Sequence, residues 1–247
     1  MINQVRFADA VKVFESRFCQ RWDVKEYHDP QAACFFAGVY SQKDVDVINS
    51  HRGFKIVWNT GRVRDCFYQI SPASIILRGI RMVDHLDTLP QGYRVKFANF
   101  ESQDYAMFRS NPLGDKVYWY LGDETQKESY GFSIMKKVQD LIPFEIIPGI
   151  QGHTLEHVKK YYYDKCFVNV KINDIGGFTT ATELACMGRY TIAKAKGSVP
   201  FYLPFWDVKD IVNLIRIESE KIGTIQSSLI GNFFDVGKEW QDENFWI

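Results

Sequence analysis

Residues 166–193 have the sequence CFVNVKINDIGGFTTATELACMGRYTIA, in which a strand pattern, a glycine turn and a helix pattern follow one another. The alternating, β-branched run from Cys166 to Ile172 predicts a buried strand. Gly176 and Gly177 predict a turn, and the run after them predicts a helix that ends at Gly188. This succession indicates a parallel α/β sheet. It also places unpaired backbone N–H groups at a helix N-terminus, where a phosphate binds favourably.

Thr180 and Glu183 also admit a purely structural interpretation. Their spacing fits a capping box, in which the threonine hydroxyl and the glutamate carboxylate each accept a hydrogen bond from an orphan backbone N–H. On this interpretation Glu183 stabilises the helix start and contacts no ligand. Capping and ligand binding therefore stay as alternatives for this carboxylate.

Composition argues against several classes of protein. The 247 residues include 30 Lys and Arg and 30 Asp and Glu, and without a basic excess we expect no nucleic-acid partner. The five cysteines form no C-x-x-C pair, which argues against a disulfide framework and against a cysteine zinc site. With neither a bilayer-spanning apolar run nor a signal-peptide pattern, the expected location is the cytoplasm.

The first half of the chain alternates helix and strand patterns. Phe7, Val11, Phe14 and Phe18 recur at helical spacing and predict a first helix packed on its own core. A membrane surface or a second copy of the chain, as in a homodimer, is the alternative partner of that stripe. Further expected strands are residues 32–38, 54–58, 66–70 and 93–97, and further expected helices are residues 44–50 and 74–81.

The alternation starts afresh after Asn111–Asp115, whose proline and glycine predict a linker. The patterns that follow predict strands at 116–121 and 144–147 and helices at 132–141 and 155–163. We therefore predict two α/β domains, residues 1–113 and 114–230. A last helix, residues 231–247, is expected to return to the first domain, and ligands are expected in a cleft between the two sheets.

The second half resembles the donor-binding half of retaining glycosyltransferases with two Rossmann-like domains, the GT-B fold, and in particular their family four. That family carries E-A-x-A-x-G-x-P-V-I, and residues 183–192 here are ELACMGRYTI. The resemblance implies transfer of a hexose from a nucleoside diphosphate sugar, GDP-mannose or a UDP-hexose, to a hydroxyl acceptor on a glycan or glycoprotein. It implies retention of configuration without a metal or other cofactor. The short chain suits a viral or phage gene, whose product would act in the host cytoplasm.

The resemblance also assigns roles to donor-binding residues. It implies that Glu183 accepts hydrogen bonds from the ribose hydroxyls of the donor. The diphosphate would lie on the turn and helix start, and the base beside the turn after the preceding strand. The residues implied for diphosphate and base are Gly176, Gly177, Phe178, Thr179, Thr180, Gly149 and Ile150. The acceptor would approach the glycine loop of the first domain, at Gly38 and Tyr40.

Two catalytic assignments depart from the family pattern. A family glutamate that contacts the donor sugar stands eight positions before the ribose glutamate, and Ile175 occupies that position here. Its neighbour Asp174 is our candidate to replace that carboxylate. The family's Arg and Lys pair, which neutralises the leaving diphosphate, is also missing in its usual form, and Lys127 is our candidate cation.

Three other interpretations compete. A non-catalytic nucleotide- or carbohydrate-binding module would keep the fold and lose turnover. His153, Glu156 and His157 spell H-x-x-E-H, as in a zinc metallohydrolase, but Thr154 is predicted to cap the helix and to leave His153 outside it. Asp44 and Asp46 spell D-x-D, a metal-binding motif, but they lie at a predicted helix start, where acidic side chains favour the helix dipole.

Overall fold

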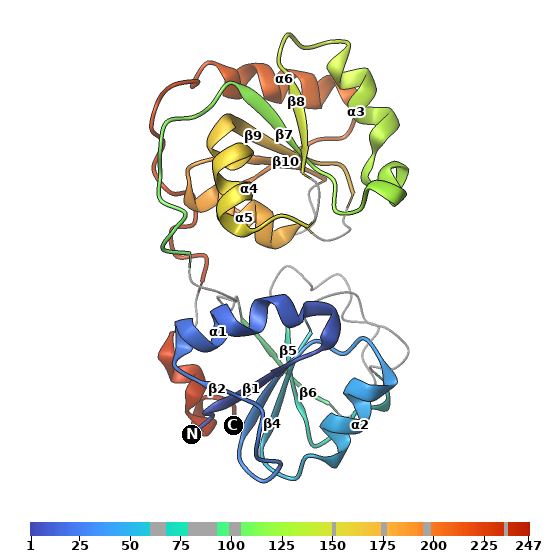
Figure 1. The fold of residues 1–247 in the computed structure, drawn as a ribbon, viewed down its shortest axis with the longest axis vertical. Coiled ribbons are helices and arrows are strands. Elements are labelled where there is room, and N and C mark those ends of the chain that lie inside the picture. The colour runs from blue at the N-terminus through green and yellow to red at the C-terminus, as the bar shows by residue number, and fades with distance from the viewer. Residues whose placement is uncertain are drawn as a thin grey trace. The chain divides into compact units, whose positions relative to one another are not determined.

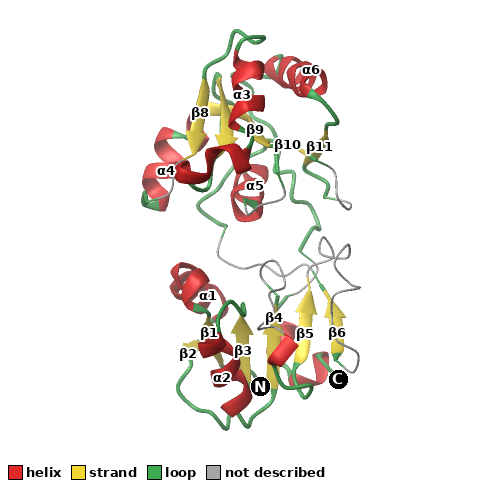
Figure 2. Cartoon of the chain, turned by 90° about the vertical axis from the view of Figure 1, so that its right-hand side faces the viewer, coloured by secondary structure: helices red, strands yellow, loops and turns green. Residues whose placement is uncertain are grey.

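The computed structural model describes residues 1–59, 68–78, 93–98, 105–149, 152–173, 177–194, 199–234 and 237–247. The chain forms two compact units, Met1–Asp104 with Asn232–Ile247 and Tyr105–Gly231 (Figure 1). In the described residues, each unit contains one sheet whose paired strands all run parallel (Figure 2). The predicted α/β class, with two parallel sheets, is confirmed.

The sheet of the first unit has the strand order β2-β1-β3-β4-β5-β6. Its strands are β1 (Gln4–Phe7), β2 (Lys25–Glu26), β3 (Cys34–Ala37), β4 (Lys55–Trp58), β5 (Ile75–Arg78) and β6 (Arg94–Phe97). Helices α1 (Glu15–Trp22) and α2 (Gln42–Ser50) accompany it. Because β3 and β4 are buried at every position, their side chains supply a core on each face of the sheet.

Alternation along the strands divides the first unit's apolar residues between these two cores. Phe35 and Ile56 belong to a core that includes Phe18 of α1. Their neighbours Phe36 and Val57 point the other way, into a core that α2 covers. The predicted strands 32–38 and 54–58 and the helix 44–50 correspond to β3, β4 and α2.

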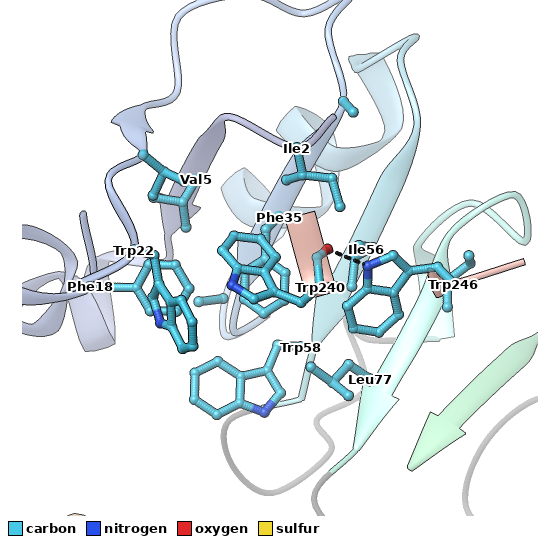
Figure 3. Packing of buried hydrophobic residues seen from close by; sticks show 14 of the residues in the cluster. Ile2, Val5, Phe18, Trp22, Phe35, Ile56, Trp58, Leu77, Trp240 and Trp246 are labelled. Carbon is cyan, nitrogen blue, oxygen red and sulfur yellow. Dashed lines mark hydrogen bonds between the residues drawn. The ribbon is translucent and has the colours of Figure 1, made fainter. Parts of the chain in front are cut away.

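The C-terminal segment packs into the first unit. Trp240 and Trp246 belong to its larger core, and the Trp246 indole N–H donates to the Trp240 carbonyl at 2.7 Å (Figure 3). The backbone N–H of Ile2 donates to the Gln241 carbonyl at 2.7 Å, so this segment lies beside the N-terminus. In place of the single helix expected over 231–247, the structure has two 3-10 turns, Lys238–Gln241 and Glu243–Phe245.

The N-terminus differs from its prediction as one long helix. Phe7 ends β1, a 3-10 turn follows at Asp9–Phe14, and α1 begins only at Glu15. The ring of Phe7 nevertheless contacts that of Phe18, with centroids 5.3 Å apart. The helical spacing of these apolar residues led to the wrong prediction of one helix. A strand followed by a helix can place apolar residues at the same intervals when both contact one core.

The helix predicted over 74–81 is also wrong, because Ile75–Arg78 form strand β5 between β4 and β6. A short apolar run fits a buried strand as well as a helix, and here pairing with two neighbours selects the strand. Of the expected strand 66–70, residues 68–70 are described and form no strand. The expected strand 93–97 corresponds to β6.

The sheet of the second unit has the order β11-β10-β9-β7-β8. Its strands are β7 (Lys116–Tyr120), β8 (Ile146–Gly149), β9 (Cys166–Lys171), β10 (Thr191–Ala193) and β11 (Tyr202–Pro204). Its helices are α3 (Phe132–Gln139), α4 (Leu155–Tyr161), α5 (Phe178–Cys186) and α6 (Val208–Ser219). Helices α3 and α6 pack together on one face, and α4 and α5 lie on the other (Figure 1).

Residues 105–113 belong to the second unit, although the sequence placed the boundary at 113. Leu113 is buried in the second unit's core, and its backbone N–H donates to the Thr224 carbonyl at 2.9 Å. The Gly114 N–H donates to the Cys166 carbonyl at 3.1 Å. The turn at Asn111–Asp115 is therefore attached to the second unit and is not the exposed linker that its proline and glycine predicted.

Candidate functional site

The strand order of the second unit identifies one edge of its sheet as a candidate ligand site. The first strand of this unit, β7, lies between the second and the third, β8 and β9, so the order reverses at β7 and β9. In open parallel sheets, ligands bind beyond the carboxyl ends of the strands at such a point. Here those ends are Tyr120 and Lys171, and residues 172–177 connect β9 to α5.

The turn at Gly177 directs the chain from this edge into α5. Gly177 has a φ of 72°, in the left-handed region that favours glycine. The side chain of Tyr120 lies against it, and burial raises the pKa of the Tyr120 hydroxyl to about 12. A Cβ on Gly177 would lie 2.7 Å from the Tyr120 ring. The end of β7 thus supports the start of α5, and only glycine fits between them.

Among the described residues, no side chain caps the first turn of α5. Its N-cap residue is Gly177, and the first intrahelical hydrogen bond runs from the Ala181 N–H to the Gly177 carbonyl at 3.0 Å. The N–H groups of Phe178, Thr179 and Thr180 precede that bond and lie at the positive end of the helix dipole. These are the groups that the sequence assigned to a diphosphate.

The capping-box interpretation of Thr180 and Glu183 is wrong. The helix begins at Phe178, so Thr180 lies inside its first turn and not at the N-cap. Glu183 accepts instead a hydrogen bond from the Tyr163 hydroxyl, at 2.7 Å between Oη and Oε2. Glu183 is only 4% exposed, and its carboxylate lies on the buried face of α5.

Substitution of Gly177 tests how rigidly this turn is held. We expect Gly177→Ala to destabilise the protein by about 2–3 kcal/mol, because left-handed strain of roughly 1 kcal/mol adds to overpacking against Tyr120. Gly223→Ala is the matched control, since Gly223 has a φ of 80° and open space around its Cα. It should lose only the strain contribution. Urea unfolding of both variants measures the difference, and equal losses would contradict close packing at Gly177.

The predicted base-binding turn lies at the end of β8, the next strand along the edge. Gly149 is buried, and a Cβ there would lie 1.7 Å from the Tyr118 hydroxyl oxygen. Burial raises the pKa of Tyr118 far above its usual value, so this phenol is neutral. Tyr118 and Tyr120 alternate with the core residues of β7, so both face α4 and α5. Ile150 lies outside the described residues.

The two catalytic candidates are placed less completely. Lys127 is exposed in the 3-10 segment Glu124–Tyr130 that follows β7, and its amine lies 4.4 Å from the centre of the Phe132 ring. Within the described ranges it forms no hydrogen bond or ion pair with α5. Asp174 and Gly176 lie outside the described residues, so the structure does not place them relative to Glu183.

In the first unit, the acceptor-side residues also follow a strand at the point where the order reverses. Gly38 follows β3, has a φ of 85° and donates its N–H to the Trp58 carbonyl at 2.9 Å. The backbone N–H of Tyr40 donates to Asp44 at 3.1 Å. Gly38 and Tyr40 therefore lie at the edge of the first sheet where a ligand site is expected.

Asp44 of the D-x-D motif has a structural role. It is 1% exposed, forms a capping box with Ser41 at the start of α2, and pairs with Arg6 at 3.1 Å. Its carboxylate oxygens accept hydrogen bonds from the Tyr40 and Ser41 backbone and from the Ser41 hydroxyl. The prediction that Asp44 lies at a helix start is confirmed. The capping box explains why an acidic residue occupies this position.

The H-x-x-E-H motif begins outside a helix, as predicted. Thr154 caps α4, and its hydroxyl oxygen accepts from the His157 N–H at 3.3 Å. The rings of His153 and His157 are nevertheless stacked, with centroids 4.4 Å apart. In the described part of the chain, no three His, Cys, Asp or Glu side chains are grouped so that they could hold a metal ion. The four described cysteines are free thiols.

Sequence reasoning missed the tyrosines around the site. Tyr118, Tyr120 and Tyr163 contact Gly149, Gly177 and Glu183, respectively. The sequence KVYWY of β7 could have indicated two of them, because side chains alternate along a strand and Tyr118 and Tyr120 therefore lie on the same face of the sheet. Tyr163 gave no such signal, since its partner Glu183 lies 20 positions further along the chain.

Comparison with known proteins gave no match: no protein-family model matches the chain, and no curated protein is significantly similar to it. Among the described helices, none combines the length and the apolar character needed to cross a membrane.

Proposed function

We propose that the protein is a glycosyltransferase of the GT-B type that transfers a hexose from a nucleoside diphosphate sugar to a hydroxyl acceptor, with retention of configuration. The observation that carries this proposal is the site at the reversal point of the second sheet. There the N-terminus of α5, which no described side chain caps, follows the left-handed Gly177, and the buried carboxylate of Glu183 lies on the same helix. Such a site suits a diphosphate and the hydroxyls of its ribose.

The organisation of the chain supports the same proposal. Two parallel α/β units follow one another, and the C-terminal segment packs in the first. The resemblance to two-domain glycosyltransferases implies the same return of the last segment. In the proposed enzyme the first unit, with Gly38 and Tyr40 at its strand ends, takes the acceptor.

The proposed chemistry depends on stabilising the charge that develops on the departing diphosphate. The backbone N–H groups of Phe178, Thr179 and Thr180 are fixed donors at a helix N-terminus, and preorganised donors of this kind stabilise a developing negative charge. Lys127 is the proposed additional cation, and Asp174 the proposed contact to the donor sugar. The acceptor attacks from the face that the diphosphate leaves, so no enzyme nucleophile is required.

Glu183→Gln tests the proposed site. Glutamine can still accept from Tyr163 but loses the charge, so donor affinity should fall by about 1.5–3 kcal/mol, roughly tenfold to a hundredfold, with little change in melting temperature. Titration calorimetry with GDP-mannose and UDP-glucose measures the loss. Glu218→Gln is the matched control, because Glu218 is equally buried at 4% but lies near the end of α6, paired with Lys221.

Two outcomes would contradict the proposal. Wild-type protein that binds no sugar nucleotide would exclude a donor site. A Glu183→Gln variant that melts earlier than wild type but binds donor equally well would limit Glu183 to a structural role. The replacement of the family's sugar-contacting glutamate by Ile175 favours a second candidate, a binding module without turnover. Release of nucleoside diphosphate in the presence of acceptor separates the enzyme from the module.

A further inference from the structure

His51 lies in the interior of the first unit, directly after the C-terminal end of α2. It is 1% exposed, and its ring packs edge-on against the ring of Phe36, with centroids 5.2 Å apart. The Tyr27 hydroxyl is hydrogen-bonded to Nδ1 at 3.3 Å, whereas Nε2 is buried without a hydrogen-bond partner in the described structure. A protonated ring carries an N–H donor on both nitrogens, and the donor on Nε2 would lack an acceptor there. The surroundings therefore favour the neutral ring.

The groups packed around the ring differ in charge. Lys55 of β4 is only 8% exposed, and its amine donates to the His51 carbonyl at 2.8 Å. A cation so close disfavours a second positive charge on the ring. In the core that the ring contacts, burial raises the pKa values of the Tyr27 phenol and of the Cys34 thiol, so neither carries a charge. The charge of Asp29 acts in the opposite sense to Lys55 and favours protonation.

The balance of these effects disfavours an imidazolium at this position. Burial has the largest effect on the pKa of His51, and the charge of Lys55 adds to it. Asp29 and the backbone of Phe54 and Ala32 favour the charged ring but do not compensate for the burial. The pKa of His51 is therefore held below its ordinary value of 6.5, and the folded protein contains the neutral ring at pH 7.

His51 also lies where three segments of the first unit meet. The two residues after it, Arg52 and Gly53, donate their N–H groups to the Pro30 carbonyl at 2.8 and 3.2 Å. These bonds attach residues 27–32 to the turn between α2 and β4. The hydrogen bond from the His51 ring to the same segment, at its first residue, adds to this attachment. Displacement of the ring would therefore loosen the end of α2, the turn and residues 27–32 together.

We propose that His51 is an acid-sensitive contact of the first unit, whose protonation displaces the ring from the interior and releases the C-terminal end of α2 and residues 27–32 from each other. The opened state binds the proton more readily than the folded state. The contribution of His51 to stability is therefore complete above the ordinary histidine pKa of 6.5, and it is lost progressively as the pH falls toward the lower pKa of the folded protein. This inference does not depend on the proposed function.

Amide hydrogen exchange of the whole chain at pH 7.5 and pH 5.5, corrected for the intrinsic pH dependence of exchange, tests the proposal. Uptake of one proton on opening changes the opening equilibrium constant by up to tenfold per pH unit. Protection of residues 27–32 and 47–53 should therefore fall by about three- to tenfold at the lower pH. Protection of β9 and α5 in the second unit should not change in this way.

Two variants assign the effect to one imidazole. In His51→Gln the amide can still accept from Tyr27 but takes up no proton, so protection of these residues should be the same at both pH values. His28→Gln is the matched control, because His28 is exposed in the same segment and its Nδ1 contacts the Glu26 carbonyl at 2.8 Å. This variant should lose protection at pH 5.5 as the wild type does.

Proton NMR of the wild type gives a measurement that needs no variant to fold. At pH 6.5, where an ordinary histidine is half protonated, the His51 ring should be less than half protonated. Half or more protonation of this ring at pH 6.5 in the folded protein would overturn the proposal. Unchanged protection of residues 27–32 and 47–53 in the wild type, or an equal fall in His51→Gln, would overturn it as well.

Discussion

Replacing Trp240 by alanine should destabilise the first unit by about 3–5 kcal/mol, the usual cost of removing a large aromatic side chain from a packed core. Trp240 is fully buried although it lies near the C-terminus. Its ring contacts Phe18, Trp22 and Phe35, with centroids 5.2–5.8 Å apart (Figure 3). Because these partners belong to α1 and β3, the C-terminal segment completes a core that residues 1–104 leave open.

Urea unfolding followed by far-UV circular dichroism measures this effect. Trp206→Ala is the control, because Trp206 is 80% exposed in the second unit and its loss should change stability by no more than about 0.5 kcal/mol. The unfolding transition of the second unit should be unaffected in the Trp240 variant. If Trp240→Ala were as stable as Trp206→Ala, the C-terminal segment would not be part of the first core.

The sequence predicted those elements whose apolar runs have clear boundaries. Strands β3, β4 and β9 are β-branched or aromatic runs. Strands β3 and β4 end next to Gly38 and Asn59, and β9 ends two residues before Asn173. Each strand was predicted within a few residues of its observed bounds. Strand β5 was predicted as a helix, because no periodicity distinguishes a short buried strand from a helical turn. Pairing with β4 and β6 decides this case, and pairing is not visible in a local window.

The longest described helix, α6, was not predicted, although the sequence carried its signals. Asp207 and Asp210 form a capping box, and Val208, Ile211 and Ile215 follow at helical spacing. A capping box followed by apolar residues at this spacing is sufficient to predict such a helix.

The candidate site was only partly accessible from the sequence. The glycine turn and helix were predicted, because Gly177 and the apolar run after it are local signals. The start of α5 was misplaced, since the left-handed conformation of Gly177 lets the helix begin two residues before Thr180. The partner of Glu183 could not be predicted, because only the return of α5 along β9 brings Tyr163 within hydrogen-bonding distance.

Replacing Arg189 by methionine should destabilise the second unit by about 3–5 kcal/mol, because it removes a donor from two buried carbonyl groups and one partly buried carbonyl group, at about 1–3 kcal/mol for each one left unpaired. Arg189 is fully buried, and its guanidinium donates to the carbonyls of Cys166, Met187 and Pro112 at 2.7–3.0 Å. Cys166 keeps a second donor, the Gly114 N–H, whereas no other donor is found for Met187 and Pro112 in the described structure. Methionine fills most of the volume, so the loss reports mainly on hydrogen bonds.

Arg189 also attaches the turn at Pro112 to the rest of the second unit, which gives the prediction a second measurement. Limited proteolysis should cut wild-type protein slowly at Asn111–Asp115, because this turn is hydrogen-bonded to the second unit, and should cut Arg189→Met there faster. Arg216→Met is the matched control, since Arg216 is exposed on α6 and, among the described residues, donates only to the Leu141 carbonyl at 3.3 Å. Rapid cleavage of the wild type at this turn would contradict this expectation. It would indicate that residues 111–115 form an exposed linker, as their sequence predicted, and that Arg189 does not hold them on the second unit.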